Sequence, residues 1–150
     1  MSDLVVRTTV VGAEKVILRL RGIKERGLDL TVPFKESALY MLGSVNKNFR
    51  GGGRPRRWKP LSPAYLKRKV GQGYSSTPLT RTGHLLRSIT RKVQRNRFTL
   101  GSAVEYAAVH QFGGGNNIPA RPYLVFQKDD LKAIEGRVIK FINGRSLTGG

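Results

Sequence analysis

The residues whose types could support catalysis are two histidines, His84 and His110. His110 follows Glu105 by five residues and Tyr106 by four, and a positioned carboxylate can orient an imidazole as a general base. The chain has no cysteine to act as a nucleophile, and no G-x-S-x-G turn presents a serine. Histidines with lysine and arginine neighbours could imitate a ribonuclease site, but such neighbours are common on any basic protein. The sequence therefore favours a protein that is not an enzyme and has no catalytic residue.

Metal and phosphate-cradling sites find little support in the sequence. Two histidines and scattered acids offer no metal-ligand spacing, and the lack of cysteine excludes thiolate ligands. Three consecutive glycines occupy residues 113–115, but they follow no predicted strand and match neither the P-loop nor the dinucleotide-binding pattern. They predict a tight turn, because glycine reaches backbone angles closed to other residues. We expect no metal and no cofactor.

Positive charge is the dominant chemical feature of the chain. Lysine and arginine number 28 against 9 acids, which gives a net charge of +19, and no acid lies between Glu36 and Glu105. A field of this size attracts nucleic acid or an acidic protein surface. Trp58 or Tyr65 could stack on bases, yet no recognised nucleic-acid-binding module is present. The candidates for an anionic partner are Arg54, Arg56, Arg57, Lys59, Lys67, Arg68 and Lys69.

Hydrophobic spacing predicts the elements that hold these residues. Residues 13–26 favour a helix, although a strand competes because apolar residues also alternate there. Residues 34–49 carry a clean stripe of apolar residues three or four apart, and a last helix begins at Asp129 and stops at Asn143-Gly144. Short helices are expected at 63–70, capped by Ser62, at 82–89, capped by Thr82, and at 106–112. Strands are expected at 4–11, on both sides of a turn at Arg95-Asn96, and at 118–126.

These elements sum to an α+β fold, with helices packed on a small, mainly antiparallel sheet. The length of 150 residues favours one domain over 1–150. Residues 50–80 are rich in Gly, Pro, Ser and bases and predict a long extended basic arm, which Trp58 would anchor on an apolar surface of a neighbouring subunit. Residues 145–150 predict a loose tail. No apolar run approaches the ~20 residues of a membrane span, and no signal-peptide pattern is present, so a cytoplasmic protein is expected.

The stretch 105–126 predicts a shaped contact element. A short apolar segment leads into the glycines, and Pro119 and Pro122 then stiffen the backbone on both sides of Arg121. Four segments in this order, 54–69, 77–89, 101–114 and 118–124, resemble the virion morphogenesis proteins of tailed phages. These are also described as tail-completion proteins of Mu-like and related phages. The matching residues are Trp58, Pro60, Leu61, Ser62, Thr82, Gly83, Leu85, Ser88, Tyr106, Ala107, His110, Gln111, Gly113, Gly114, Pro119, Ala120, Arg121, Pro122 and Tyr123.

The resemblance implies a non-enzymatic virion component at the phage neck, which forms a homo-oligomeric ring around the DNA channel and completes the tail. A hexamer is favoured over a dodecamer. The implied partners are other copies, adjacent neck and tail-tube proteins and, non-specifically, packaged DNA; assembly would occur in the host cytoplasm, without a membrane. The alternative is a monomeric, non-specific nucleic-acid-binding protein. The GGGNN run before IPARP departs from the family pattern. The expected interface residues are Trp58, Pro60, Leu61, Tyr106, His110, Gln111, Arg121 and Tyr123.

Overall fold

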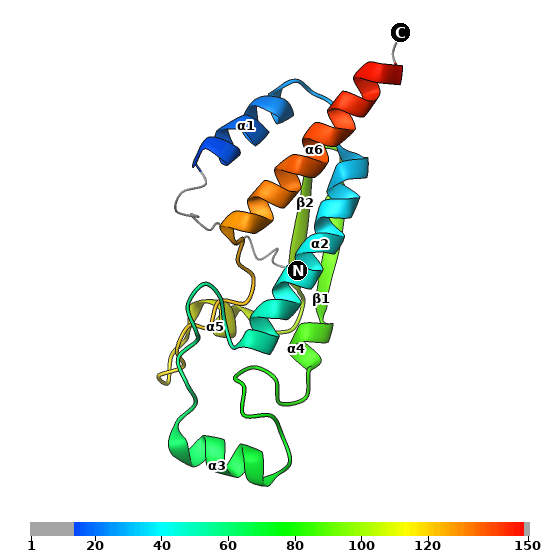
Figure 1. Cartoon of the computed structure of the whole chain (residues 1–150). Helices are drawn as coiled ribbons and strands as arrows, with labels where there is room; N and C mark the ends of the chain where they lie inside the picture. Colours follow the sequence, from blue (N-terminus) through cyan, green and yellow to red (C-terminus); the bar gives the residue numbers. More distant parts are fainter. Residues whose placement is uncertain (1–13, 149–150) are drawn as a thin grey trace. The chain divides into compact units, whose positions relative to one another are not determined.

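A computed structural model describes residues 14–148 of the chain. These residues form six helices and a two-stranded antiparallel sheet (Figure 1), so the α+β class is confirmed. The strand expected at 4–11 lies outside the described residues. In chain order the elements are α1 (Glu14–Glu25), α2 (Thr31–Gly51), α3 (Pro63–Gly71), α4 (His84–Arg87), β1 (Ile89–Gln94), β2 (Arg97–Ser102), α5 (Ala107–Phe112) and α6 (Lys128–Thr148).

The helices lie where the sequence predicts, but two differ in their bounds. The helix expected at 82–89 with Thr82 as its cap is only α4 (His84–Arg87): Gly83 is at the N-cap position without a side-chain cap bond, and Ile89 begins β1. Ser62 caps α3 as expected, since its hydroxyl accepts from the backbone N–H of Tyr65 at 3.4 Å. Helix α6 does not stop at Asn143-Gly144 but continues to Thr148. A glycine inside a helix costs only about 1 kcal/mol relative to alanine, so it need not end a helix that packs well elsewhere.

The antiparallel hairpin β1–β2 turns at Arg95-Asn96, as predicted. The strand expected at 118–126 does not form, and this prediction was wrong. Instead, the bridge between Gly114 and Ile118 closes the turn after the glycines. Beyond this bridge the chain is irregular. Arg121, Tyr123 and Leu124 are its buried residues, and the side chain of Gln111 in α5 binds its backbone.

Contacts within the chain divide it into two compact units. Among the described residues, unit 1 comprises 43–90 and 101–125, and unit 2 comprises 14–42, 91–100 and 126–148. The boundary falls within α2 and within both strands of the hairpin. The apolar stripe predicted for α2 is buried along its length: Ala38 and Met41 lie in unit 2, and Val45 and Phe49 lie in unit 1.

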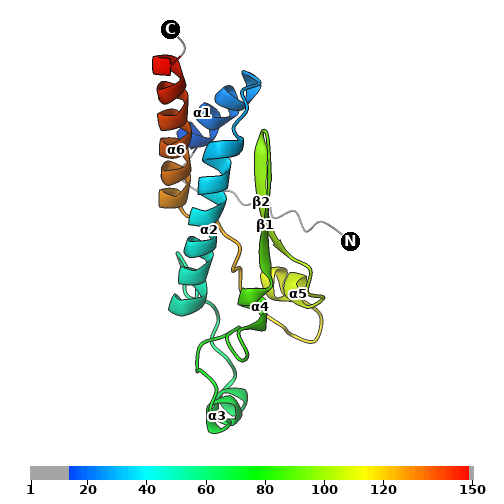
Figure 2. The ribbon, with the colours of Figure 1, turned by 90° about the vertical axis from the view of Figure 1, so that its right-hand side faces the viewer.

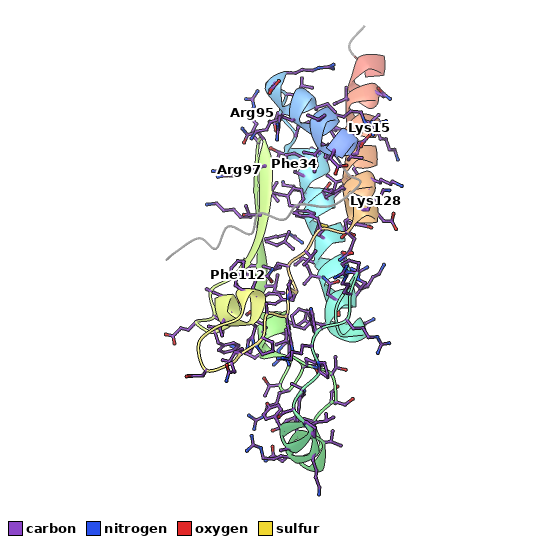
Figure 3. The ribbon with its side chains drawn as sticks, turned by 90° about the vertical axis from the view of Figure 1, so that its left-hand side faces the viewer. Lys15, Phe34, Arg95, Arg97, Phe112 and Lys128 are labelled. Atoms are coloured by element: carbon purple, nitrogen blue, oxygen red, sulfur yellow. The ribbon has the colours of Figure 1, made fainter. Side chains whose placement is uncertain are left out.

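Unit 2 has its apolar core among α1, α6, the first part of α2 and its part of the hairpin (Figure 2). The ring of Phe34 meets that of Phe98 edge to face at a centroid distance of 5.5 Å, and Figure 3 shows Phe34 between α2 and the hairpin. Arg19 of α1 donates two hydrogen bonds, of 2.8 and 3.2 Å, to the nearly buried carboxylate of Glu135. The buried residues at the centre are Leu30, Met41, Ile134 and Val138.

Unit 1 contains the end of α2, then α3, α4 and α5 and the irregular segments between them. Figure 1 shows α3 at the end of this unit that lies away from α4 and α5. Its buried apolar residues come from all four of the segments that resemble the phage family, or from α2. They are Val45, Phe49, Trp58, Leu85, Ala107, Tyr123 and Leu124.

The structure shows no extended basic arm over residues 50–80. Trp58 is 7% exposed and lies in the core of its own unit, not on an arm that reaches a neighbour. Its backbone N–H donates to the Gly52 carbonyl at 2.7 Å, which turns the chain back at the end of α2. Gly53 permits this turn, because its φ is +106° and an added Cβ would lie 2.7 Å from the Trp58 ring. Composition alone suggested an arm because Trp58, Lys59 and Pro60 find partners more than sixty residues away in the chain, in Arg121 and Pro122.

Candidate functional site

Two of the family-like segments are joined by reciprocal hydrogen bonds in unit 1. The guanidinium of Arg121 donates to the carbonyls of Lys59 at 2.8 Å and Pro60 at 3.2 Å. The indole N–H of Trp58 donates to the carbonyl of Pro122 at 2.9 Å. Each segment thus supplies a side chain that binds the other's backbone. Arg121 is 7% exposed, so its first role is to hold the chain together.

Gln111 holds the same segment from the α5 side. Its side-chain oxygen accepts from the backbone N–H groups of Tyr123 and Leu124, both at 3.0 Å. Its amide nitrogen donates to the Leu124 carbonyl, also at 3.0 Å. The hydroxyl of Tyr123 donates to the Ala107 carbonyl at 2.9 Å, and burial raises the pKa of Tyr123 to about 12. The buried side-chain amide of Gln111 therefore satisfies backbone groups that a neighbouring strand would otherwise bind.

The end of α2 completes this frame. The side-chain amide of Asn48 donates to the Tyr123 carbonyl at 2.9 Å, while its oxygen accepts from Arg54 at 2.8 Å. Arg54 also donates to the backbone and hydroxyl oxygens of Ser44, at 2.6 and 2.8 Å. The ring of Phe49 contacts the rings of Trp58 and Tyr123 at 5.7 and 5.5 Å between centroids. We call Asn48, Phe49, Trp58, Gln111, Arg121 and Tyr123 the motif frame.

His110 does not have the surroundings of a general base. Its Nδ1 is buried without a hydrogen-bond partner, so no carboxylate orients the imidazole through that atom. Its ring meets Tyr106 edge to face at 5.7 Å, and Tyr106 in turn lies 6.3 Å from His84 between ring centroids. Burial lowers the pKa of His110, and the positive charge of Arg121 acts in the same direction, which favours the neutral ring at pH 7. Across residues 14–148 no three His, Asp or Glu residues gather closely enough to hold a metal ion.

The eight residues expected at an interface separate into two groups. Trp58, Gln111, Arg121 and Tyr123 are buried in the motif frame. Pro60 and Tyr106 are exposed, and Leu61 and His110 are half-buried. Two large apolar residues that sequence reasoning did not single out, Phe112 and Ile118, are 55% and 37% exposed on α5 and on the turn that follows. Figure 3 labels Phe112 on α5. The position of Phe112 directly before three glycines was the sequence feature that could have indicated its exposure.

The seven basic candidates also separate by burial. Arg54 points into the motif frame, and Lys69 is 3% exposed, with its ammonium donating to the Thr77 carbonyl at 2.6 Å. Trp58 is buried and is therefore not free to stack on a base. The exposed bases are Arg56, Arg57, Lys59, Lys67 and Arg68.

A hollow of about 270 Å³ opens beside α3. Sequence reasoning placed Arg68 and Lys69 together but missed Arg81, which reaches the same hollow from the segment before α4. The absence of acids between Glu36 and Glu105 was the sequence feature that could have indicated this cluster of cations. The hollow is lined by Tyr65, Arg68, Lys69, Gln72 and Arg81.

Comparison with known proteins agrees with the motifs that form the frame. A model of the phage virion morphogenesis family matches residues 11–143, which include nearly all of both units. The chain belongs to the phage virion morphogenesis family. Membership explains why the four segments occur in this order. In the structure all four lie in unit 1, where hydrogen bonds join them.

Individual relatives are consistent with this family. The protein of Haemophilus influenzae named Mu-like prophage FluMu G protein 2 is 41% identical over 96 residues, which cover 60% of this virion morphogenesis protein but only 62% of that relative. Protein G of Escherichia phage Mu, whose name proposes a role in capsid assembly, is 31% identical over 126 residues, covering 77% of this chain and 80% of that protein. An uncharacterised protein of Methanocaldococcus jannaschii is 37% identical over 112 residues, or 67% and 82% of the two chains.

No solved structure matches the chain. Among the helices of residues 14–148, none is both long and apolar enough to cross a bilayer.

Proposed function

We propose that this protein is a structural virion component that forms a homo-oligomeric ring at the phage neck, where it completes the tail and joins it to the head around the DNA channel. The observation that carries this proposal is the family match over residues 11–143. Its partners are further copies of itself, with six favoured over twelve, and the adjacent neck and tail-tube proteins. It assembles in the host cytoplasm and remains in the virion without a catalytic role.

The geometry supports an assembly role in unit 1. The polar side chains of the motif frame bind backbone groups of their own chain. They therefore hold the segments of unit 1 together and are not available to react with a substrate. Tyr106, Phe112 and Ile118 remain exposed in this unit. In a closed ring, each subunit must offer both a patch and its complement. Unit 2 also carries exposed large apolar residues, namely Leu18, Val32, Leu39 and Ile139.

Deletion of the gene from a phage or inducible prophage that encodes it tests this proposal. Electron microscopy should show heads and tails that fail to join or tails of abnormal length, and complementation should restore normal particles. An antibody to the protein should label the neck of normal particles. Normally joined particles that lack the protein would end the proposal.

A second candidate, a monomeric protein that binds nucleic acid without sequence preference, is favoured by the five exposed bases between Arg56 and Arg68. It requires tight DNA binding with a steep salt dependence, of about 0.9 per phosphate contacted. It also requires that the protein stays monomeric under virion-assembly conditions. Sedimentation of the same sample therefore separates the two candidates, because a ring-forming protein assembles and this candidate does not.

A further inference from the structure

The hollow beside α3 is built by one face of the helix, by Gln72 at its C-cap and by Arg81 from a separate segment. Tyr65, Arg68, Lys69 and Gln72 are spaced by three, one and three residues, which places them on the same side of α3. Arg81 closes the hollow from the segment before α4. Two positive side chains from α3 and one from a separate segment therefore converge on the same space.

Both arginines of this hollow are positioned by aromatic rings. The guanidinium carbon of Arg68 lies 5.3 Å from the ring centre of Tyr65, and that of Arg81 lies 5.1 Å from the ring centre of Tyr74. Stacking on a ring restricts a guanidinium while leaving its N–H edge free to donate. Such an edge fits two oxygens of a phosphate with parallel hydrogen bonds.

The base of the hollow is also positive. Lys69 is almost fully buried, and its ammonium is held by the Thr77 carbonyl at 2.6 Å. Burial lowers the pKa of Lys69, and the charges of Arg121 and Arg81 lower it further. A buried cation beside two others is electrostatically costly unless an anion offsets it.

The described part of unit 1 offers almost no anion for this purpose. Glu105 is the one acid in residues 43–90 and 101–125, and it is exposed. The residues lining the hollow include no carboxylate. The described residues of unit 1 therefore supply no carboxylate to this hollow.

We propose that the α3 hollow binds a phosphate group, and that the backbone of DNA supplies it. Two guanidinium edges, the Gln72 amide and the adjacent ammonium match the several acceptor oxygens of a phosphate better than the two of a single carboxylate. A chain with a net charge of +19 also attracts a polyanion and gains from the release of its counterions. This site adds to the proposed ring function and does not depend on it.

Lys67 provides a matched control on the same helix. It is exposed, and the helical repeat of 3.6 residues places it outside the face that carries Arg68 and Lys69. Lys67→Gln removes the same charge as Arg68→Gln or Arg81→Gln without removing a residue that lines the hollow. Circular dichroism of the three variants checks that each retains the helical content of the full chain.

The first experiment measures the anisotropy of a fluorescent DNA duplex at increasing salt with the full-length protein and each variant. We expect Arg68→Gln and Arg81→Gln each to reduce the slope of log affinity against log salt by about 0.9, and Lys67→Gln to change it by less than half as much. An equal effect of all three variants would show a diffuse positive surface without a site, and would overturn the proposal.

The second experiment works on the unaltered protein and identifies the source of the phosphate. NMR signals of the arginine side-chain N–H groups are followed as inorganic phosphate, or the duplex, is added at constant ionic strength with chloride as the reference. Saturable shifts of Arg68 and Arg81 with the duplex support the whole proposal. Shifts with free phosphate alone retain the phosphate site but overturn DNA as its source. No shift with either would overturn both and leave an acidic protein as the partner of the hollow.

Discussion

At the scale of single residues, one buried glutamine stabilises the segment that the family motifs share. Gln111 is 3% exposed and satisfies two backbone donors and one acceptor of Tyr123 and Leu124. A buried backbone group that loses its partner costs about 1–3 kcal/mol. This makes Gln111 a structural residue whose conversion to an apolar side chain of similar size is a severe change.

We predict that Gln111→Leu lowers the free energy of unfolding by about 3 kcal/mol or more, since three backbone groups lose their partner. Urea unfolding followed by circular dichroism measures this loss. The exposed Gln72 is the control, and Gln72→Ala should change stability by about 0.5 kcal/mol or less. Equal stability of Gln111→Leu and the natural chain would mean that this network is absent in solution.

The glycine turn gives a second prediction at this scale. Gly113 has a φ of +81°, and an added Cβ would lie 3.0 Å from the Ala120 nitrogen, whereas Gly115 has nothing within 4 Å. Gly113→Ala should destabilise the protein by about 1–3 kcal/mol through backbone strain. Gly115→Ala should have little effect. Thermal unfolding of the two variants checks the contrast, and an equal response would contradict the geometry of the turn.

His110 gives a prediction about pH. Because burial and Arg121 lower its pKa in the folded protein, the unfolded chain binds the proton more readily than the folded chain just below the ordinary value of about 6.5. Stability should therefore be complete above that pH and fall as the pH decreases, by at most about 1.4 kcal/mol per pH unit from this group. Urea midpoints between pH 7.5 and 5.5 should show a shallower decline for His110→Gln than for His84→Gln. The same decline in both variants would exclude His110 as its source.

At the scale of elements, local pattern was informative wherever one face of a helix meets the core. The apolar spacing predicted α1, α2 and α6, and Ser62 with Pro63 predicted α3. It failed at residues 118–126, because the partners of that backbone are a glutamine side chain and an asparagine more than seventy residues earlier. The spacing of apolar residues within a segment cannot indicate hydrogen-bond partners that lie far away in the sequence.

The segment 50–80 failed for the same reason. Its glycines, prolines and bases resemble a solvated arm, yet Trp58 and Arg121 bind each other's neighbouring carbonyls across more than sixty residues. For the candidate site, the family resemblance identified Trp58, Gln111, Arg121 and Tyr123 of the motif frame. It did not identify Asn48 or Phe49. It could not distinguish those that face the core from those that remain exposed.

Trp58 provides the prediction that belongs to this scale. Removing a buried aromatic side chain typically costs about 3–5 kcal/mol, and the Pro122 carbonyl also loses its donor. Trp58→Ala should therefore lower the stability of the monomer itself, with loss of helical signal at reduced denaturant concentrations. Trp58→Phe keeps an aromatic ring beside Phe49 and should lose less. A fully stable Trp58→Ala monomer that only fails to assemble would contradict the buried position.

At the scale of the whole molecule, the net charge of +19 and the family membership motivate the proposed ring. The family model spans residues of both units, so the match describes nearly the whole described chain and not one motif. Most of the acid-free region, residues 43–90 and 101–104, lies in unit 1, where the exposed bases Arg56, Arg57, Lys59, Lys67 and Arg68 are found. A ring around a DNA channel would bring these cations close to phosphates.

The most direct test of the proposed ring is native mass spectrometry of the purified full-length protein over a concentration series, with negative-stain images of the same samples. We predict one closed oligomer, with six copies favoured, and ring-shaped particles with a central opening. A monomer at every concentration, or an unlimited ladder of species without closure, would contradict a ring-forming neck protein.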